Sequence, residues 1–190
     1  MTERSTGTIR VERIAQVGWI WLDRPAVHNA FNSQMIGELR AALAVLGADE
    51  SVRVVVLSGT GKSFCAGADL NWMREIIRFS YEQNLAESFE LAEWLDELSA
   101  LPKPTVARVN GAAIGGGAGF LSACDIVVAS TDAMFGLSEV KIGLVPACIA
   151  PYVLRRTGDG RARQYFLTGE RFDARRAFEI GLVNILAEPG

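Results

Sequence analysis

The stretch NGAAIGGGAGFLSACD, residues 110–125, places four glycines within five positions, just before an apolar segment. Glycine has no Cβ, so a ligand or a neighbouring element can approach the main chain closely there. A helix beginning near Gly116 would leave its first N–H groups unpaired and point its positive end outward. Tight packing of a helix on a strand would use the same residues, so the run alone leaves both interpretations open.

A second glycine-containing loop, CAGAD at residues 65–69, also follows a buried strand. One N–H group from each loop could bind a single oxygen that gains negative charge during a reaction. Such an oxyanion hole contributes about 3–4 kcal/mol per donor. The pair of loops therefore predicts a site for an oxyanion.

Two nucleotide-binding motifs match these loops only in part. A Walker loop ending in Gly61-Lys62-Ser63 would need glycine at position 56, which is valine. A dinucleotide fingerprint starting at Gly115 would need glycine at position 120, which is phenylalanine. Neither nucleotide class fits.

Strand and helix signals alternate along the chain, which predicts an α/β fold in one domain spanning residues 1–190. The helix at 33–46 has Asn32 or Ser33 as its expected N-cap. Prolines at 102 and 104 end the second helix, and glycine at 181 closes the third. The expected strands are 8–14, 17–23, 52–59, 104–111 and 124–130, and the expected helices are 33–46, 84–101 and 173–184.

Composition restricts the function classes. Of 190 residues, 49% are hydrophobic, which suits a globular core, and the net charge of −3 argues against a nucleic-acid partner. No apolar run is long enough for a membrane span and the polar N-terminus has no leader pattern, so we expect a cytoplasmic protein. Three scattered cysteines and the lone His28 predict no disulfide framework and no metal site. Cys65 as a nucleophile would lack a second histidine to activate it.

Four segments together resemble the enoyl-CoA hydratase/isomerase (crotonase) superfamily. They occur in the order and spacing of that family, and the resemblance extends from about Ile9 to Asn184. It implies a crotonase-like spiral of ββα units acting on an acyl-CoA thioester. The segments are WLDRPAVHNAFN, SFCAGADLNWM, VNGAAIGGGAGFLSACDI and FGLSEVKIGLVP.

The resemblance also implies roles for individual residues. The N–H groups of Ala68 and Gly116 would bind the thioester oxygen, and Glu139 would move the proton. Asp69 would brace its own loop within the CoA-binding segment. No cofactor is implied beyond the CoA of the substrate, and homotrimers or hexamers are expected. The CoA would lie near Val27, Ala30, Ala66, Gly67, Asp69 and Leu70.

The hydratases of this family hold water between two glutamates. The later one corresponds to Glu139, whereas the earlier one corresponds to Gly119 and is missing. One carboxylate suffices for a Δ3,Δ2-enoyl-CoA isomerase, because a single base can remove and return the proton. Hydration remains possible if Glu139 holds the water alone. A non-catalytic interpretation is that Glu139 is a surface residue at the start of a helix, where the helix dipole favours an acidic side chain.

We expect hydration ahead of isomerisation. The segments around Cys65, Glu139 and Thr168 look closest to bacterial 3-methylglutaconyl-CoA and isohexenylglutaconyl-CoA hydratases, which act on branched glutaconyl thioesters. A substrate carboxylate near Gly119 would explain the loss of a like charge there. Two further residues, Trp72 and Met73, are expected to line the acyl pocket or its lid, with packing in the core as the alternative.

The family usually continues beyond this chain's last residues with C-terminal helices, which this sequence lacks either because the protein is naturally short or because the sequence is a fragment. A non-catalytic oligomer partner with the crotonase fold is therefore a third possibility, and the acidic charge argues against an RNA-binding relative. The arginines at 155, 156, 161 and 163 are expected on a solvated helix face, with CoA phosphates or a substrate carboxylate as alternative partners.

Overall fold

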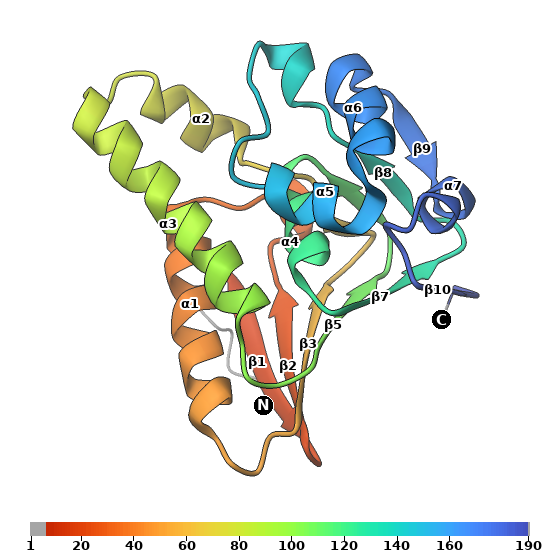
Figure 1. The fold of residues 1–190 in the computed structure, drawn as a ribbon. Coiled ribbons are helices and arrows are strands. Elements are labelled where there is room, and N and C mark those ends of the chain that lie inside the picture. The colour runs from red at the N-terminus through yellow and green to blue at the C-terminus, as the bar shows by residue number, and fades with distance from the viewer. Residues whose placement is uncertain (1–6, 190) are drawn as a thin grey trace.

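The computed structural model describes residues 7–189, in which a six-stranded sheet forms the largest layer (Figure 1). Its order is β1-β2-β3-β5-β7-β10, and every neighbouring pair is parallel except the β1–β2 hairpin. The predicted strands all appear here, and β10 completes the edge. The bounds are β1 Ile9–Ile14, β2 Val17–Leu22, β3 Val54–Gly59, β5 Thr105–Val109, β7 Ile126–Ser130 and β10 Ile185–Ala187.

A second sheet of four short strands has the order β4-β6-β8-β9. Its first three members each directly follow a long strand, β3, β5 and β7, so a two-strand unit repeats along the chain. This repeat confirms the predicted ββα spiral. The sequence did not reveal these strands, because three residues are too few for an alternation pattern. The bounds are β4 Ser63–Cys65, β6 Ala112–Ile114, β8 Met134–Gly136 and β9 Arg171–Asp173.

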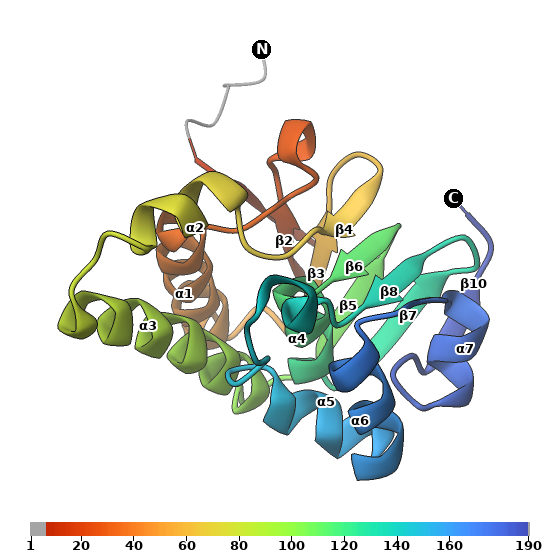
Figure 2. The same cartoon turned by 90° about the horizontal axis from the view of Figure 1, so that it is seen from above.

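The helices lie against the sheets, with α1 and α3 side by side on one flank and α4 at the centre (Figures 1 and 2). No helix among residues 7–189 combines the length and apolar character needed to cross a membrane. The bounds are α1 Ser33–Ala48, α2 Leu70–Ile76, α3 Tyr81–Ser99, α4 Gly116–Ala123, α5 Ala150–Thr157, α6 Asp159–Thr168 and α7 Ala174–Glu179, with short 3-10 helices η1 Pro25–Val27 and η2 Glu139–Ile142.

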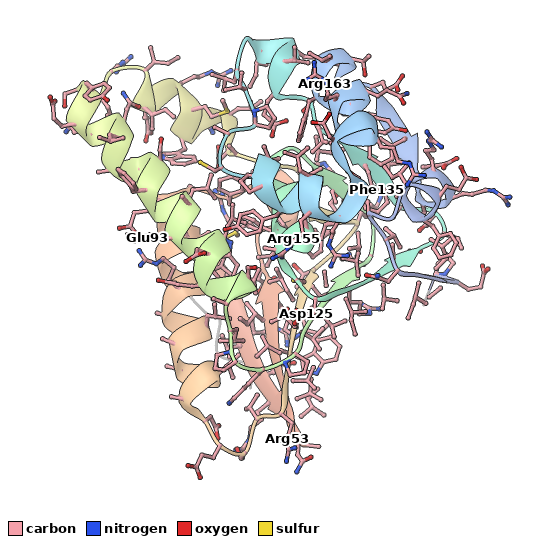
Figure 3. The ribbon with its side chains drawn as sticks, viewed as in Figure 1. Arg53, Glu93, Asp125, Phe135, Arg155 and Arg163 are labelled. Carbon is pink, nitrogen blue, oxygen red and sulfur yellow. The ribbon has the colours of Figure 1, made fainter. Side chains whose placement is uncertain are left out.

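Side-chain caps fix the starts of α1 and α3. The Asn32 side chain accepts the Met35 N–H at 3.0 Å, as the sequence predicted. Helix α3 begins at Tyr81 rather than residue 84, because Ser80 and Gln83 form a capping box. Arg40 of α1 pairs with three glutamates of α3, of which Glu93 is labelled in Figure 3. These contacts hold the two helices together along the flank.

The C-terminal end of α4 is anchored by two charged side chains. Asp125, labelled in Figure 3, accepts the Thr105 N–H at 2.8 Å and so ties the end of α4 to β5. Arg156 donates to the carbonyls of Ser122, Cys124 and Asp125. The prediction of a solvated arginine face is therefore wrong for Arg156, whose guanidinium caps α4 from α5.

Candidate active site

A cavity of about 500 Å³ opens over the N-terminal end of α4. Its walls come from the loop after β4, from α3, from η2 and from the segment that leads into α5. Most of the lining is apolar, and only two lining side chains are charged, Glu139 and Lys141. The lining residues are Phe31, Ala66, Gly67, Ala68, Leu70, Met73, Ser88, Leu91, Gly115, Gly116, Ser138, Glu139, Lys141, Ile142, Leu144, Val145, Pro146, Ala147, Cys148 and Ile149.

The loop after β4 leaves one N–H group unpaired in this cavity. Phe31 donates its N–H to the carbonyl of Gly67 at 2.9 Å and accepts the Asp69 N–H at 2.8 Å. The N–H of Ala68, between them, has no acceptor within residues 7–189. Gly67 makes the turn possible with φ +95°, a conformation that side chains disfavour.

Helix α4 contributes a second free N–H group. Gly115, with φ +53°, donates its own N–H to the Gly136 carbonyl at 2.8 Å. Gly116 is the first helical residue, and no acceptor for its N–H occurs in the described part of the chain. A Cβ placed on Gly67 would lie 3.8 Å from the Gly116 nitrogen, so the two loops adjoin. The predicted pair of donors therefore lines one cavity.

The glycines of α4 also serve packing, so both interpretations of the run apply. A Cβ on Gly116 would lie 2.7 Å from Phe31 Cζ, and one on Gly117 would lie 2.9 Å from Cys65 Cβ. Both distances are below normal non-bonded contact. Each glycine thus meets a different neighbour, and α4 is enclosed from several sides.

Glu139 places a carboxylate beside these donors. It begins η2, and its Oε1 lies 3.1 Å from where a Cβ on Gly115 would be. Its Oε2 is buried and has no hydrogen-bond partner within the described residues. Burial raises the pKa of Glu139 above the ordinary glutamate value, since desolvation disfavours the charged form. A half-buried carboxylate with a raised pKa in a cavity is suited to proton transfer.

The position of the missing glutamate is filled. A Cβ on Gly119 would lie 2.7 Å from the Cβ of Ile149 and even closer to its Cγ2. Ile149 is buried and lines the cavity. The hypothesis that a substrate carboxylate occupies space next to Gly119 is therefore wrong in this geometry, because an aliphatic side chain already occupies it.

The structure brings together most, but not all, of the predicted site residues. Ala66, Gly67, Ala68, Leu70, Gly116 and Glu139 line the cavity, and Met73 joins them. Val27 and Ala30 lie outside the cavity lining. Their segment contacts the loop through a hydrogen bond in which Ala66 N–H donates to the His28 carbonyl at 3.0 Å. Trp72 packs edge-on against Phe31 instead of lining the cavity.

Asp69 also lies outside the cavity lining and braces the loop. Its carboxylate accepts the Asn71 N–H at 2.9 Å, capping α2, and pairs with Arg24 at 2.8 Å. These bonds to the charged form lower the pKa of Asp69 despite the opposing effect of its desolvation. Arg24 thereby connects η1 with the loop that carries Ala68.

The cysteines are free thiols in the structure. Burial raises the pKa of Cys65 and of Cys124 to about 12, so both stay protonated at neutral pH. Cys65 therefore behaves as a small apolar residue under Gly117 rather than as a nucleophile. Cys148 is half-buried in the cavity wall.

Sequence reasoning missed the segment that forms the outer wall. Residues 141–149 contribute Lys141, several apolar side chains and Ile149, although only Glu139 was singled out from that region. The apolar run IGLVPACIA was the available signal. It has neither helical nor strand periodicity, so the sequence could not show which of its side chains face the cavity.

Comparison with known proteins agrees with this geometry. A sequence model described as enoyl-CoA hydratase/isomerase matches residues 12–188. The chain belongs to the enoyl-CoA hydratase/isomerase family. A Thermus thermophilus protein named as an enoyl-CoA hydratase is 41% identical over 182 residues, covering 96% of this chain and 72% of that protein. Within the family, the general class of function and the predicted fold are confirmed.

A solved structure gives the same result. A Legionella pneumophila protein described as an enoyl-CoA hydratase/isomerase (crotonase) superposes with a TM-score of 0.95 at 45% identity, covering 97% of this chain and 71% of that one. A Dictyostelium discoideum relative of the family is 35% identical over 179 residues, and the chain spans 62% of its length. The family is shared by all three, whereas kinship to the glutaconyl-CoA hydratases stays a prediction.

Proposed function

We propose that this chain adds water across the 2,3 double bond of an enoyl-CoA thioester. The observation that carries the proposal is the buried, unpartnered Glu139 oxygen in the cavity that holds the free N–H groups of Ala68 and Gly116. A thioester oxygen bound between the two donors would be stabilised as it becomes an enolate oxygen. Glu139 would serve as the acid and base for the carbon atoms.

The proposed hydration needs one carboxylate. Glu139 accepts a proton from water as the water oxygen bonds to C3 and the 2,3 double bond shifts toward the thioester oxygen. The enolate then collapses, and C2 receives the proton from Glu139. One water is added, and the carboxylate returns to its starting state. A raised pKa favours this exchange because the protonated form of Glu139 is accessible.

We further propose a branched glutaconyl-type substrate, whose second carboxylate needs a cation. Because Ile149 fills the space at Gly119, Lys141 is the cation that we assign to this carboxylate. It lines the cavity two residues after Glu139, and no ion pair joins it to an acid in the described structure. Lys141→Gln should raise KM for 3-methylglutaconyl-CoA by about tenfold, the loss of one charged pair. KM for crotonyl-CoA should stay within about twofold; equal effects on both substrates would contradict this assignment.

A second reaction, the shift of a 3-enoyl double bond to position 2, is favoured by the single carboxylate. Glu139 would remove a proton from C2 and return it to C4 through a dienolate bound by the same donors. Ile149 supports this alternative, because it excludes a second acid from the α4 side. The two reactions leave different products, one heavier by a water.

Product mass with 3-methylglutaconyl-CoA tests the main proposal. The expected result is a gain of one water by the wild type, with Glu139→Gln at least about 100-fold slower. No water gained, together with turnover of a 3-enoyl-CoA, would establish the isomerase instead. Absence of acyl-CoA binding would favour a non-catalytic oligomer partner.

We also propose self-association into trimers or hexamers. Support comes from large apolar side chains exposed beside the cavity, on α2, α3 and the segment before α5. Light scattering of the purified protein should give a multiple of the monomer mass, and a monomer at micromolar concentration would contradict the proposal. The exposed side chains are Leu70, Ile77, Tyr81, Leu85, Phe89, Ile142, Leu144 and Val145.

A further inference from the structure

Gly119 and Ile149 form a close pair between α4 and the cavity. Gly119 lies three residues after Gly116, on the α4 face turned toward the start of α5. A Cβ on Gly119 would be 2.7 Å from Ile149 Cβ and closer still to Cγ2, so no side chain fits at position 119 while Ile149 stays in place.

Ile149 is held firmly where it lies. It is 3% exposed, and as the N-cap residue of α5 it accepts the N–H groups of Tyr152 and Val153 at 3.2 and 3.1 Å. Next to it, Ala150 donates to the Pro146 carbonyl at 2.9 Å. Its branched Cβ also restricts χ1. Rotation of this side chain away from Gly119 is therefore disfavoured.

Ile149 also lines the cavity, so it separates Gly119 of α4 from the space where a substrate would lie. The two lining side chains that carry charge, Glu139 and Lys141, both lie on η2. The wall at Ile149 is thus aliphatic, and an acid on α4 at residue 119 would have to replace it. A water molecule in the cavity meets one carboxylate rather than two.

We propose that Ile149 is a specificity-determining residue that keeps the site to one carboxylate. By filling the space at Gly119, it prevents a second acid from sharing the attacking water with Glu139. It thereby favours proton transfers that a single base completes. This inference rests on the proposed function for its chemical meaning, but its packing claim stands on geometry alone.

A stability series tests the packing claim without any assay of activity. Gly119→Glu should lower the melting temperature by about 5–10 °C, as overpacking of a core does. Adding Ile149→Gly should recover at least half of that loss, although Ile149→Gly alone is destabilising. The control is Gly37→Glu on the exposed face of α1, where a Cβ meets nothing within 4 Å. It should change the melting temperature by less than about 2 °C.

A milder pair covers the case in which Gly119→Glu does not fold. Gly119→Ala introduces the same Cβ, so it should be destabilising in the wild-type background and much less so beside Ile149→Ala. The proposal would be overturned if the losses of melting temperature from the substitutions at 119 and 149 simply added in both pairs. It would also be overturned if Gly119→Ala were as stable as the wild type.

A product assay tests the chemical claim. We expect Gly119→Glu/Ile149→Gly to raise the ratio of crotonyl-CoA hydration to 3-enoyl-CoA isomerisation by about tenfold or more over Ile149→Gly. An unchanged ratio in a folded double variant would overturn the specificity role. If the wild type turns over neither substrate, the proposed function fails, while the melting series still decides whether Ile149 excludes a side chain at residue 119.

Discussion

The floor of the cavity, which is helix α4, and its rim, which comprises α2 with Ile77 and the segment 141–149, differ in how deeply their side chains are buried. On the floor, Ala118, Phe120 and Leu121 of α4 are completely buried, and a Cβ on each helix glycine, 116, 117 or 119, would meet a different neighbour. On the rim, Ile77 and Val145 are 81% and 78% exposed. The thioester end of a substrate would thus meet a rigid backbone, whereas the far end would meet apolar side chains that the described residues leave uncovered. Chemistry and acyl selection should therefore respond separately to substitution.

The largest expected effect comes from removing the carboxylate of the floor. Glu139→Gln should reduce kcat by about 10³-fold with KM nearly unchanged, because proton transfer is lost while the donors remain. Steady-state kinetics with the proposed substrate, 3-methylglutaconyl-CoA, would measure it. Glu93→Gln, on α3 outside the cavity lining, is the matched control and should retain wild-type kcat. A similar fall in both variants would show that Glu139 acts through the fold.

A glycine of the floor should tolerate substitution far less than a glycine outside it. Gly117→Ala should lower stability by about 2–3 kcal/mol, because its Cβ would meet the main chain of Cys65. Gly37→Ala, on the exposed face of α1, should raise stability by about 0.5–1 kcal/mol. Urea denaturation of both variants measures the contrast. Equal responses would mean that the floor is less rigid than its contacts indicate.

The pH dependence of kcat/KM should show a single acidic limb. Burial raises the pKa of Glu139, so the base form appears at a higher pH than for an ordinary glutamate, and activity should rise with pH through that raised pKa. The other titratable lining groups are Lys141 and Cys148; burial raises the pKa of Cys148 above the usual thiol value, so a plateau should follow through neutral pH. A second limb between pH 5 and 8, persisting in Glu139→Gln, would reveal another essential group.

The same ionisation has a small consequence for stability. A carboxyl whose folded pKa is raised binds more protons when folded, so its contribution to stability declines as pH rises from the unfolded to the folded pKa. The wild type should therefore lose stability relative to Glu139→Gln across that window and keep a constant difference above it. Thermal melts between pH 4 and 8 measure the difference, and parallel curves would contradict the burial of this carboxylate.

The smallest effect is expected on the rim. Val145→Ser should change the stability of the monomer, at concentrations too low for self-association, by less than about 0.5 kcal/mol, since its side chain is already largely in solvent there. Leu121→Ala on the floor should cost about 2–5 kcal/mol for the cavity that it leaves. The same urea titration compares them. A larger loss that arises only at concentrations where the chain self-associates would agree with the proposed assembly, whereas a large loss in the monomer would contradict the exposure of the rim.

The sequence predicted the floor better than the rim for a physical reason. The long strands, the Asn32 cap and the glycine loops have local signals, and the resemblance to the crotonase superfamily implied that Ala68, Gly116 and Glu139 belong to one site. The short strands β4, β6 and β8 have only three residues each, so no periodicity marks them. The contacts of Ile149 with Gly119 and of Arg156 with α4 join residues about 30 positions apart. Only the folded chain shows which residues meet.

The contact between Gly119 and Ile149 also orders the routes by which such a sequence can diverge. A larger residue at 119 is acceptable only after position 149 has become smaller, whereas a smaller residue at 149 is acceptable first at the cost of a cavity. The two substitutions are therefore epistatic, and their order is constrained. Among descendants of a chain like this one, residue sizes at positions 119 and 149 should vary in opposite directions.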